Sequence, residues 1–244
     1  MVPSLEQRLA ARKRPERKPR MYQRWVDLLF LHWSCDPGWI QDLLPEGLKL
    51  DLWEGKAWIG VVPFQMKNVR FRGTPAIPGI SNFNELNVRT YVHDSKGRPG
   101  VWFISLDTDS RLAAWLGRGL FGLNYFSAKI DFERTGKKIT WHACRRGEKF
   151  SDKMGHRIRE DLPEAVPGSI EFFLLERYHY FVGQGRRLQI GQVHHRPYPL
   201  AVADVAHWYQ GPMVWNGMKQ FPKPPDHMIC SSGVDVEIFK AEAV

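Results

Sequence analysis

Three side chains that can do chemistry recur at every second position of one segment, NELNVRTYV. Glu85, Asn87 and Arg89 offer a carboxylate, an amide and a guanidinium, whereas Leu86 and Val88 between them are apolar. This alternation is typical of a β-strand, in which neighbouring side chains point to opposite faces. A carboxylate can serve as a general base and a guanidinium can bind an anion, so this polar row is a candidate functional site.

The polar row has two interpretations, which differ in whether the sheet is open. On an open sheet the row faces water and carries no function, whereas in a closed barrel it lines the lumen. Glu85 and Arg89 lie about 13 Å apart along a strand, which is too far for a direct ion pair. Buried charges need partners, so in a lumen these two side chains would hold the two ends of a ligand.

The polar row is expected in a hairpin that is followed by a short helix. The segment VWFISLDTD is predicted to return alongside NELNVRTYV after the connection DSKGRPG. The next segment, SRLAAWLGRGLFG, is predicted to be a helix, because Ser110 is a suitable N-cap, alanine and leucine fill the interior, and Gly122 can end it.

The remaining segments predict more strands than helices. A short helix is expected at residues 36–45, capped by Asp36, and a helical turn at residues 204–208. Hairpins are expected at residues 124–146, turning at RTGK, and at residues 170–198, turning at GQG. The predicted fold class is therefore α+β, strand-rich and mainly antiparallel, with a few short flanking helices. That many strands in one domain usually close into a barrel or form a sandwich.

The charge of the chain is concentrated at its N-terminus. The 244 residues carry a formal net charge of +9, and residues 1–20 contribute +5 through seven basic and two acidic residues. We expect residues 1–20 to be a disordered basic tail and residues 21–244 to be a single domain. A basic tail can contact nucleic acid, which stays open as an alternative but is not the favoured partner.

Several function classes lack their sequence signals. Cys35, Cys144 and Cys230 have no metal-ligand spacing and form no disulfide framework, which favours a cytoplasmic setting. His194 and His195 would point to opposite faces of a strand, so no metal site is expected. No apolar segment has the length of a membrane span, and no glycine-rich phosphate loop or nucleophile elbow is present. We therefore expect neither a membrane partner nor a cofactor.

Seven motifs stand out along residues 21–239: RWVDLLFLHW, LLPEGLKLD, AWIGVVPF, FNELNVRTYV, GVWFISLD, FLLERYHYF and SGVDVEIF. Together they resemble the bacterial YqjF-like family, a domain of unknown function. The resemblance covers most of the chain.

This family is distantly similar to the acetoacetate decarboxylases, through FNELNVRTYV and FISLDTDSRLAAWLGRGLFGLNYF. The resemblance implies a closed, cone-like antiparallel β-barrel with a lumenal site, where Glu85 matches the lumenal glutamate. In those decarboxylases one lysine forms a Schiff base with a β-keto acid, and a neighbouring lysine lowers its pKa. Gly117 and Arg118 match the helix before this pair, but Tyr125 and Phe126 stand at the two lysine positions. No Schiff base is therefore expected.

Two groups of site residues follow from the patterns and from the resemblance. Glu85 and Tyr125 are the expected catalytic residues, Glu85 as general base or hydrogen-bond acceptor and Tyr125 as donor or acid. Asn87, Arg89 and Arg118 are expected to bind the ligand, with one of the arginines taking an anionic group. The expected function is to bind or transform a small organic acid or carbonyl compound in the barrel lumen, without a Schiff base.

Two other functions stay open. The chain could be a non-catalytic ligand-binding or regulatory protein with the same lumen, which turnover of a candidate acid would exclude. It could also be a nucleic-acid-associated protein, which salt-dependent binding that disappears with the tail would support. The sequence identifies neither the small-molecule ligand nor the oligomeric state, and a homo-oligomer is compatible with it.

Overall fold

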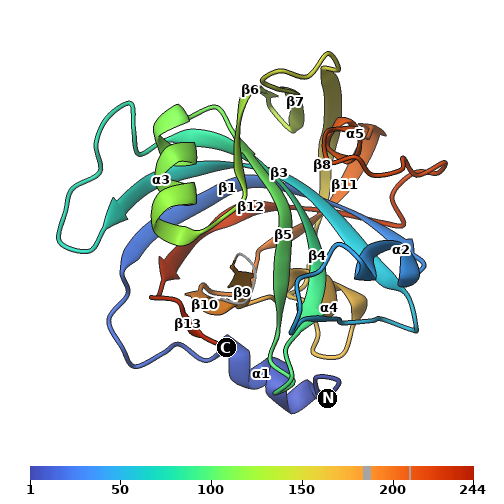
Figure 1. The fold of residues 1–244 in the computed structure, drawn as a ribbon. Coiled ribbons are helices and arrows are strands. Elements are labelled where there is room, and N and C mark those ends of the chain that lie inside the picture. The colour runs from blue at the N-terminus through green and yellow to red at the C-terminus, as the bar shows by residue number, and fades with distance from the viewer. Residues whose placement is uncertain (184–187, 209) are drawn as a thin grey trace.

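The computed structural model describes residues 1–183, 188–208 and 210–244, in which the chain forms thirteen strands and five short helices (Figure 1). The helices are α1 (Leu5–Arg12), α2 (Gly38–Gln41), α3 (Arg111–Phe121), α4 (Ile170–Leu175) and α5 (Gly211–Trp215). The strands are β1 (Met21–Cys35), β2 (Lys49–Leu50), β3 (Ala57–Phe71), β4 (Phe83–His93), β5 (Pro99–Thr108), β6 (Tyr125–Thr135), β7 (Lys138–Arg145), β8 (Asp152–Leu162), β9 (His179–Val182), β10 (Gln189–His194), β11 (Leu200–His207), β12 (His227–Ile238) and β13 (Glu242–Ala243). None of the helices in these ranges has the length and apolarity that a bilayer span requires.

All thirteen strands belong to one sheet, and most neighbouring strands run antiparallel. Their order is β13-β10-β9-β5-β6-β7-β8-β11-β12-β1-β3-β4-β2, with additional pairings of β5 with β4 and of β10 with β12. β5 pairs in parallel with β6 and with β9. A parallel pair needs a crossover connection, and α3 supplies one between β5 and β6. The strand-rich α+β class is confirmed, and these parallel pairs are the exception to its antiparallel pattern.

Helix α3 begins and ends where the sequence predicts. The Ser110 hydroxyl accepts a hydrogen bond of 3.2 Å from the backbone N–H of Ala113, which satisfies an unpaired donor of the first turn. Gly122 ends the helix in the left-handed conformation, with φ of 62°. These two local signals fix where α3 begins and where the chain leaves it for β6.

The apolar segment predicted to be a strand at residues 170–182 begins instead with helix α4. Ser169 caps this helix by accepting a hydrogen bond from the backbone N–H of Phe172. Four of its six residues are buried, so no apolar stripe distinguishes a helix from a strand here. The strand prediction holds only for β9, and the predicted turn GQG falls partly in residues 184–187, outside the described residues.

Two shorter helical predictions also need correction. Residues 204–207 lie in β11, which pairs with β8, so the predicted helical turn is wrong because this segment satisfies its backbone groups in the sheet. Helix α2 is only four residues long and has no side-chain cap. The Asp36 carboxylate accepts a hydrogen bond from Gly38 at 2.8 Å and so stabilises the turn that leads into α2.

The N-terminal segment contains a docked helix where the sequence predicts a disordered tail. Ser4 forms a capping box at the start of α1. Arg8 then forms an ion pair of 2.6 Å with Asp51, whose side chain is fully buried, and Arg14 forms an ion pair of 2.6 Å with Glu237. These acidic partners lie far along the sequence, which is why the local sequence does not indicate the docking.

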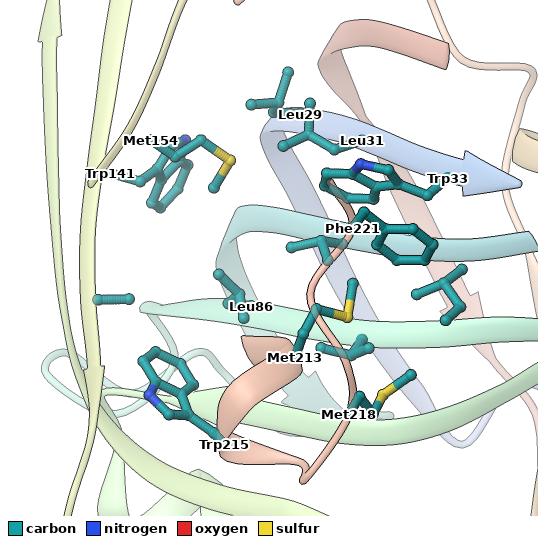
Figure 2. Packing of buried hydrophobic residues seen from close by; sticks show 14 of the residues in the cluster. Leu29, Leu31, Trp33, Leu86, Trp141, Met154, Met213, Trp215, Met218 and Phe221 are labelled. Carbon is teal, nitrogen blue, oxygen red and sulfur yellow. The ribbon is translucent and has the colours of Figure 1, made fainter. Parts of the chain in front are cut away.

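Two clusters of buried side chains lie on opposite faces of β4. Leu86 and Val88 belong to the first, the Trp141 cluster, which packs against α5 and is shown in Figure 2. Phe30 and Tyr91 belong to the second, the Phe30 cluster. Strand β4 is therefore covered on both sides, and its polar row does not face open solvent.

Candidate functional site

A cavity of about 320 Å³ lies on the face of the sheet that carries the Phe30 cluster. Glu85, Asn87 and Arg89 of β4 line this cavity together with Tyr125, the first residue of β6. Their exposed fractions are 2%, 4%, 8% and 8%, respectively. The structure thus brings four of the five predicted site residues together in one cavity, where all four are buried.

The apolar row of β4 points the other way, as the alternation predicts. Leu86 and Val88 are fully buried in the Trp141 cluster. The pairing of β4 with β5 shifts register between Val88 and Arg89, but both rows keep their faces through this point. The period-two pattern of the sequence therefore identifies the cavity-facing row correctly.

Glu85 and Tyr125 form a hydrogen-bonded pair inside the cavity. The Tyr125 hydroxyl donates to Glu85 Oε2 at 2.7 Å. Burial raises the pKa of Glu85 to about 7, against the opposing effect of the Tyr125 hydrogen bond, and the Asp107 carboxylate raises it further. Burial and the neighbouring Glu85 raise the pKa of Tyr125 well above its ordinary value, so the phenol stays protonated and donates. A carboxylate that titrates near neutral pH can both accept and release a proton.

Helix α3 positions the Tyr125 ring. A Cβ at Gly117 would lie 2.3 Å from Tyr125 Cδ2, so only glycine leaves room for the ring against the helix. Arg118 is exposed and is not among the residues that line the cavity. Its guanidinium donates to the backbone oxygen of Tyr125 at 2.8 Å. A role in positioning Tyr125 therefore replaces the predicted role of Arg118 in binding an anion.

Arg89 differs from the other buried arginines in having no acidic partner. Arg145 pairs with Asp107 at 2.6 Å, and Arg177 pairs with Asp51 at 2.7 Å. Among the described residues, Arg89 forms no ion pair; its Nη2 donates to a backbone oxygen at 3.2 Å, and its Nε has no hydrogen-bond partner. A buried guanidinium without a counter-charge is costly, and it is a ready site for an anion.

Two histidines near Arg89 are neutral. Burial, His227 and Arg89 itself lower the pKa of His32 well below its ordinary value, and burial lowers the pKa of His195 to about 4. Gly60 pairs with Arg89 across the sheet, and a Cβ there would lie 3.0 Å from the His32 ring and 3.3 Å from Arg89 Cγ. Neutral imidazoles and a bare backbone thus leave the positive charge of Arg89 uncompensated.

Asn87 adds a second unsatisfied group, since its buried Oδ1 accepts no hydrogen bond from the described residues. It lies between Glu85 and Arg89 on the same face of β4. The cavity therefore offers donors from Arg89, an acceptor from Asn87 and a titratable carboxyl group from Glu85. This combination can orient a polar ligand with an anionic group.

The sequence does not single out Arg177, which also lines the cavity. Its Nη1 is held by Asp51, which also accepts two hydrogen bonds from Arg8. The charge of Arg177 is thus compensated, and its role is to connect the cavity wall to helix α1. The motif ERYHYF does contain this arginine, but nothing in the sequence indicates that Asp51 is its partner.

No group of three histidine, cysteine, aspartate or glutamate side chains in the described parts of the chain is arranged to hold a metal ion. The ring Nδ1 atoms of His32 and His227 lie 3.0 Å apart, and no third ligand of these types joins them among those residues.

Comparison with known proteins places these features in a family. Residues 22–235 match the model of DUF2071, whose description is an uncharacterized conserved protein. The chain belongs to the DUF2071 family. It is 38% identical over 185 residues to the uncharacterized protein YqjF of Bacillus subtilis, covering 75% of this chain and 76% of that protein.

Solved structures with the acetoacetate decarboxylase-like fold are similar to this one over nearly its whole length. An acetoacetate decarboxylase-like enzyme from Sphingomonas wittichii has a TM-score of 0.65 at 15% identity, covering 93% of this chain and 94% of that one. The acetoacetate decarboxylase of Legionella pneumophila has a TM-score of 0.62 at 13% identity, covering 93% and 87%. The enduracididine biosynthesis enzyme MppR, complexed with the condensation product of pyruvate and imidazole 4-carboxaldehyde, has a TM-score of 0.64 at 13% identity, covering 93% and 90%. These likenesses show a shared fold.

Proposed function

We propose that this protein binds a small organic acid or carbonyl compound in the lumen of a closed antiparallel β-barrel and transfers a proton to or from it without forming a Schiff base. The strand pairings support closure, because they can be followed from β5 through β6, β7, β8, β11, β12, β1, β3 and β4 and then back to β5. A ring of pairings is the property that distinguishes a barrel from an open sheet. The cavity of Glu85 and Arg89 is the proposed lumen.

The observation that carries the proposal is the unpaired Arg89 in the same cavity as the Glu85–Tyr125 pair. An anionic group that pairs with Arg89 would satisfy a buried charge that no described residue satisfies. Asn87 would accept a hydrogen bond from the ligand next to this group. The proposed binding energy thus comes mainly from supplying a missing partner in a low-dielectric site.

The proposed chemistry uses Glu85 and Tyr125. Glu85, with a pKa of about 7, takes a proton from the ligand and holds it on a carboxylate oxygen. Tyr125, which remains protonated, turns its O–H from Glu85 to the ligand oxygen on which negative charge develops. Glu85 takes up the proton and Tyr125 stabilises the negative charge that develops on the ligand, so this step does not require an amine.

No Schiff base is expected to form, because none of the described residues that line the cavity is a lysine. The nearest lysine along β6, Lys129, is 76% exposed and pairs with Asp131 at 3.4 Å. Incubation with acetoacetate and borohydride should therefore leave the mass of the protein unchanged. A single stable adduct that maps to one lysine in peptide mass spectra would contradict the prediction and support an amine mechanism.

Replacing Arg89 with methionine is expected to weaken anion binding without destabilising the fold. Loss of a charge-assisted hydrogen bond of ~1.5–3 kcal/mol weakens binding by roughly 10- to 100-fold. The free energy of unfolding without ligand should rise by about 1 kcal/mol, because an apolar side chain replaces a buried, uncompensated charge. Calorimetric titration with acetoacetate, pyruvate and butanoate, together with urea denaturation, measures both effects.

The matched control for this experiment is Arg24→Met, which removes an arginine whose side chain is 57% exposed. It should leave both binding and stability unchanged. Binding of all three acids to Arg89→Met with the affinity of the original protein would reject Arg89 as the anion site, and the proposed function with it.

Binding without turnover is a second candidate function, and one observation favours it. Tyr125 donates its hydrogen bond to Glu85, so the carboxylate is already occupied by a protein partner before a ligand arrives. Solvent deuterium exchange into the carbon next to the carbonyl of a bound keto acid would separate the candidates. Proton transfer at Glu85 predicts exchange that Glu85→Gln abolishes, whereas a pure binding protein gives none.

A further inference from the structure

We infer that the ligand of this cavity is a carboxylic acid with an extended apolar tail, whose carboxylate pairs with Arg89 while the tail leaves through a mouth between residues 72–82 and α3. This inference rests on the proposed function and adds the substrate class to it. A compact keto acid would leave the apolar part of the cavity near this mouth unfilled. The argument comes from the direction of the cavity, the character of its walls and the exposure of its mouth.

The cavity has a closed end and an open end along β4. Residues 72–82 join the end of β3 to the start of β4, and α3 follows the end of β5, where Thr108 pairs with Glu85 (Figure 1). Both therefore lie at the Glu85 end of β4. Arg89 lies about 13 Å further along the strand, at the opposite end.

The mouth is identified by exposure. Ile77, Ile80 and Leu112 line the cavity, and their exposed fractions are 52%, 39% and 41%. Thr74 and Pro75 complete the exposed part of the lining, whereas Arg89 at the other end is buried. Exposed aliphatic side chains around an opening are typical of a surface that contacts an apolar ligand.

The walls between the mouth and Arg89 are apolar. Aromatic and aliphatic side chains dominate this part of the lining, including Phe64, Phe83, Phe103, Leu106 and Leu116. Glu85, Asn87 and Arg89 of β4 and Tyr125 of β6 form one polar face, and a few other polar side chains of the lining, among them Gln23, Arg70 and Arg177, lie on other segments. A pocket with apolar walls and a few placed polar groups selects a ligand that is largely apolar, and the volume of about 320 Å³ suits a small one.

The two ends together define an amphipathic anion. The headgroup must be anionic because Arg89 is buried and has no counter-charge among the described residues. The rest of the ligand must be apolar because it would replace water against the walls and against the aliphatic mouth. An acid with a linear or lightly branched chain satisfies both conditions.

The test is a calorimetric titration of the full chain with butanoate, hexanoate, octanoate and decanoate. Affinity should rise about fourfold for each added methylene that becomes buried, which corresponds to ~0.8 kcal/mol per methylene. Octan-1-ol, which has the tail but no charge, should bind at least about tenfold more weakly than octanoate, as the loss of a charge-assisted hydrogen bond requires.

Two leucine variants locate the tail. Leu112→Ser should weaken binding of decanoate by about threefold or more, since part of the buried apolar surface is lost, and should leave butanoate unaffected. Leu43→Ser is the matched control, because Leu43 has a similar exposed fraction of 45% and does not line the cavity. It should leave the affinity for every acid unchanged.

Two outcomes distinguish failure of this inference from failure of the proposed function. Equal affinities for butanoate and octanoate, both lost in Arg89→Met, would overturn the extended tail and leave the proposed function intact. Affinities that do not depend on Arg89 for any acid would overturn both. Octanol binding as tightly as octanoate would also reject the anionic headgroup.

Discussion

Replacing Asp51 with asparagine is expected to destabilise the protein by roughly 3–5 kcal/mol, because the change leaves buried positive charge without a partner. The Asp51 carboxylate pairs with Arg8 at 2.6 Å and with Arg177 at 2.7 Å, and the side chains of Asp51 and Arg177 are exposed by only 0% and 3%. Asparagine keeps the shape but not the charge. The loss is measured as a fall in the free energy of unfolding in urea.

The control for Asp51→Asn is Asp235→Asn, which breaks an ion pair with Arg24 in which the two side chains are 84% and 57% exposed. This surface change should alter stability by less than about 0.5 kcal/mol. If Asp51→Asn does not fold, Arg8→Met removes the more exposed partner and should give a smaller, measurable loss. Equal stabilities of Asp51→Asn and Asp235→Asn would show that α1 and Arg177 do not depend on the buried carboxylate.

Replacing Glu85 with glutamine is expected to remove a large part of the pH dependence of stability. Burial raises the pKa of Glu85 from an ordinary value of 4.5 to about 7 in the folded protein. Between these pH values the folded chain holds a proton that the unfolded chain has released, so the free energy of unfolding falls as pH rises. The loss amounts to roughly 3 kcal/mol across this window, at about 1.4 kcal/mol per pKa unit.

The Glu85→Gln variant should therefore gain stability relative to the original protein as pH rises from below 4.5 to above 7. Its amide oxygen can still accept the Tyr125 hydrogen bond, so the fold is kept. Urea denaturation at both ends of this window measures the effect, and Glu133→Gln, an exposed change, should leave the pH profile as it is. A profile for Glu85→Gln that runs parallel to that of the original protein would reject the raised pKa.

This prediction connects stability with function. Above pH 7 the buried carboxyl group of Glu85 is ionised, and burying this charge destabilises the fold. At the same pH the ionised carboxylate can accept a proton from a ligand. Arg89 imposes a similar penalty, because its charge has no partner among the described residues. Two destabilising charged groups in one cavity are characteristic of a site kept for binding or catalysis at the expense of stability.

Local patterns in the sequence determined the strand and the helix that carry the site. A strand repeats every two residues, so the pattern of NELNVRTYV predicted which side chains share a face, and Leu86 and Glu85 do lie on opposite sides of β4. Ser110 and Gly122 predicted the ends of α3 because capping depends on a residue and its immediate neighbours. Features set within a few residues could therefore be read from the sequence.

Long-range contacts decided the rest. Asp51 holds Arg8 of helix α1 and Glu237 holds Arg14 just beyond it, and both acidic residues are remote in sequence, so composition alone favoured a disordered tail. Helix α4 is buried on most sides, and a short apolar run carries no period that separates it from a strand. In both segments the tertiary environment selects the structure, because local preference is weak.

The sequence by itself determined that Glu85, Asn87 and Arg89 share one face, whereas only the tertiary structure decided what that face does. Tyr125 meets Glu85 across forty positions of sequence, and Arg118 turns away to hold the backbone of Tyr125. Whether a buried charge is compensated depends on which side chains the fold brings near it. A carboxylate reaches the other buried arginines, but none of the described residues supplies one to Arg89, and this difference is a property of three-dimensional packing.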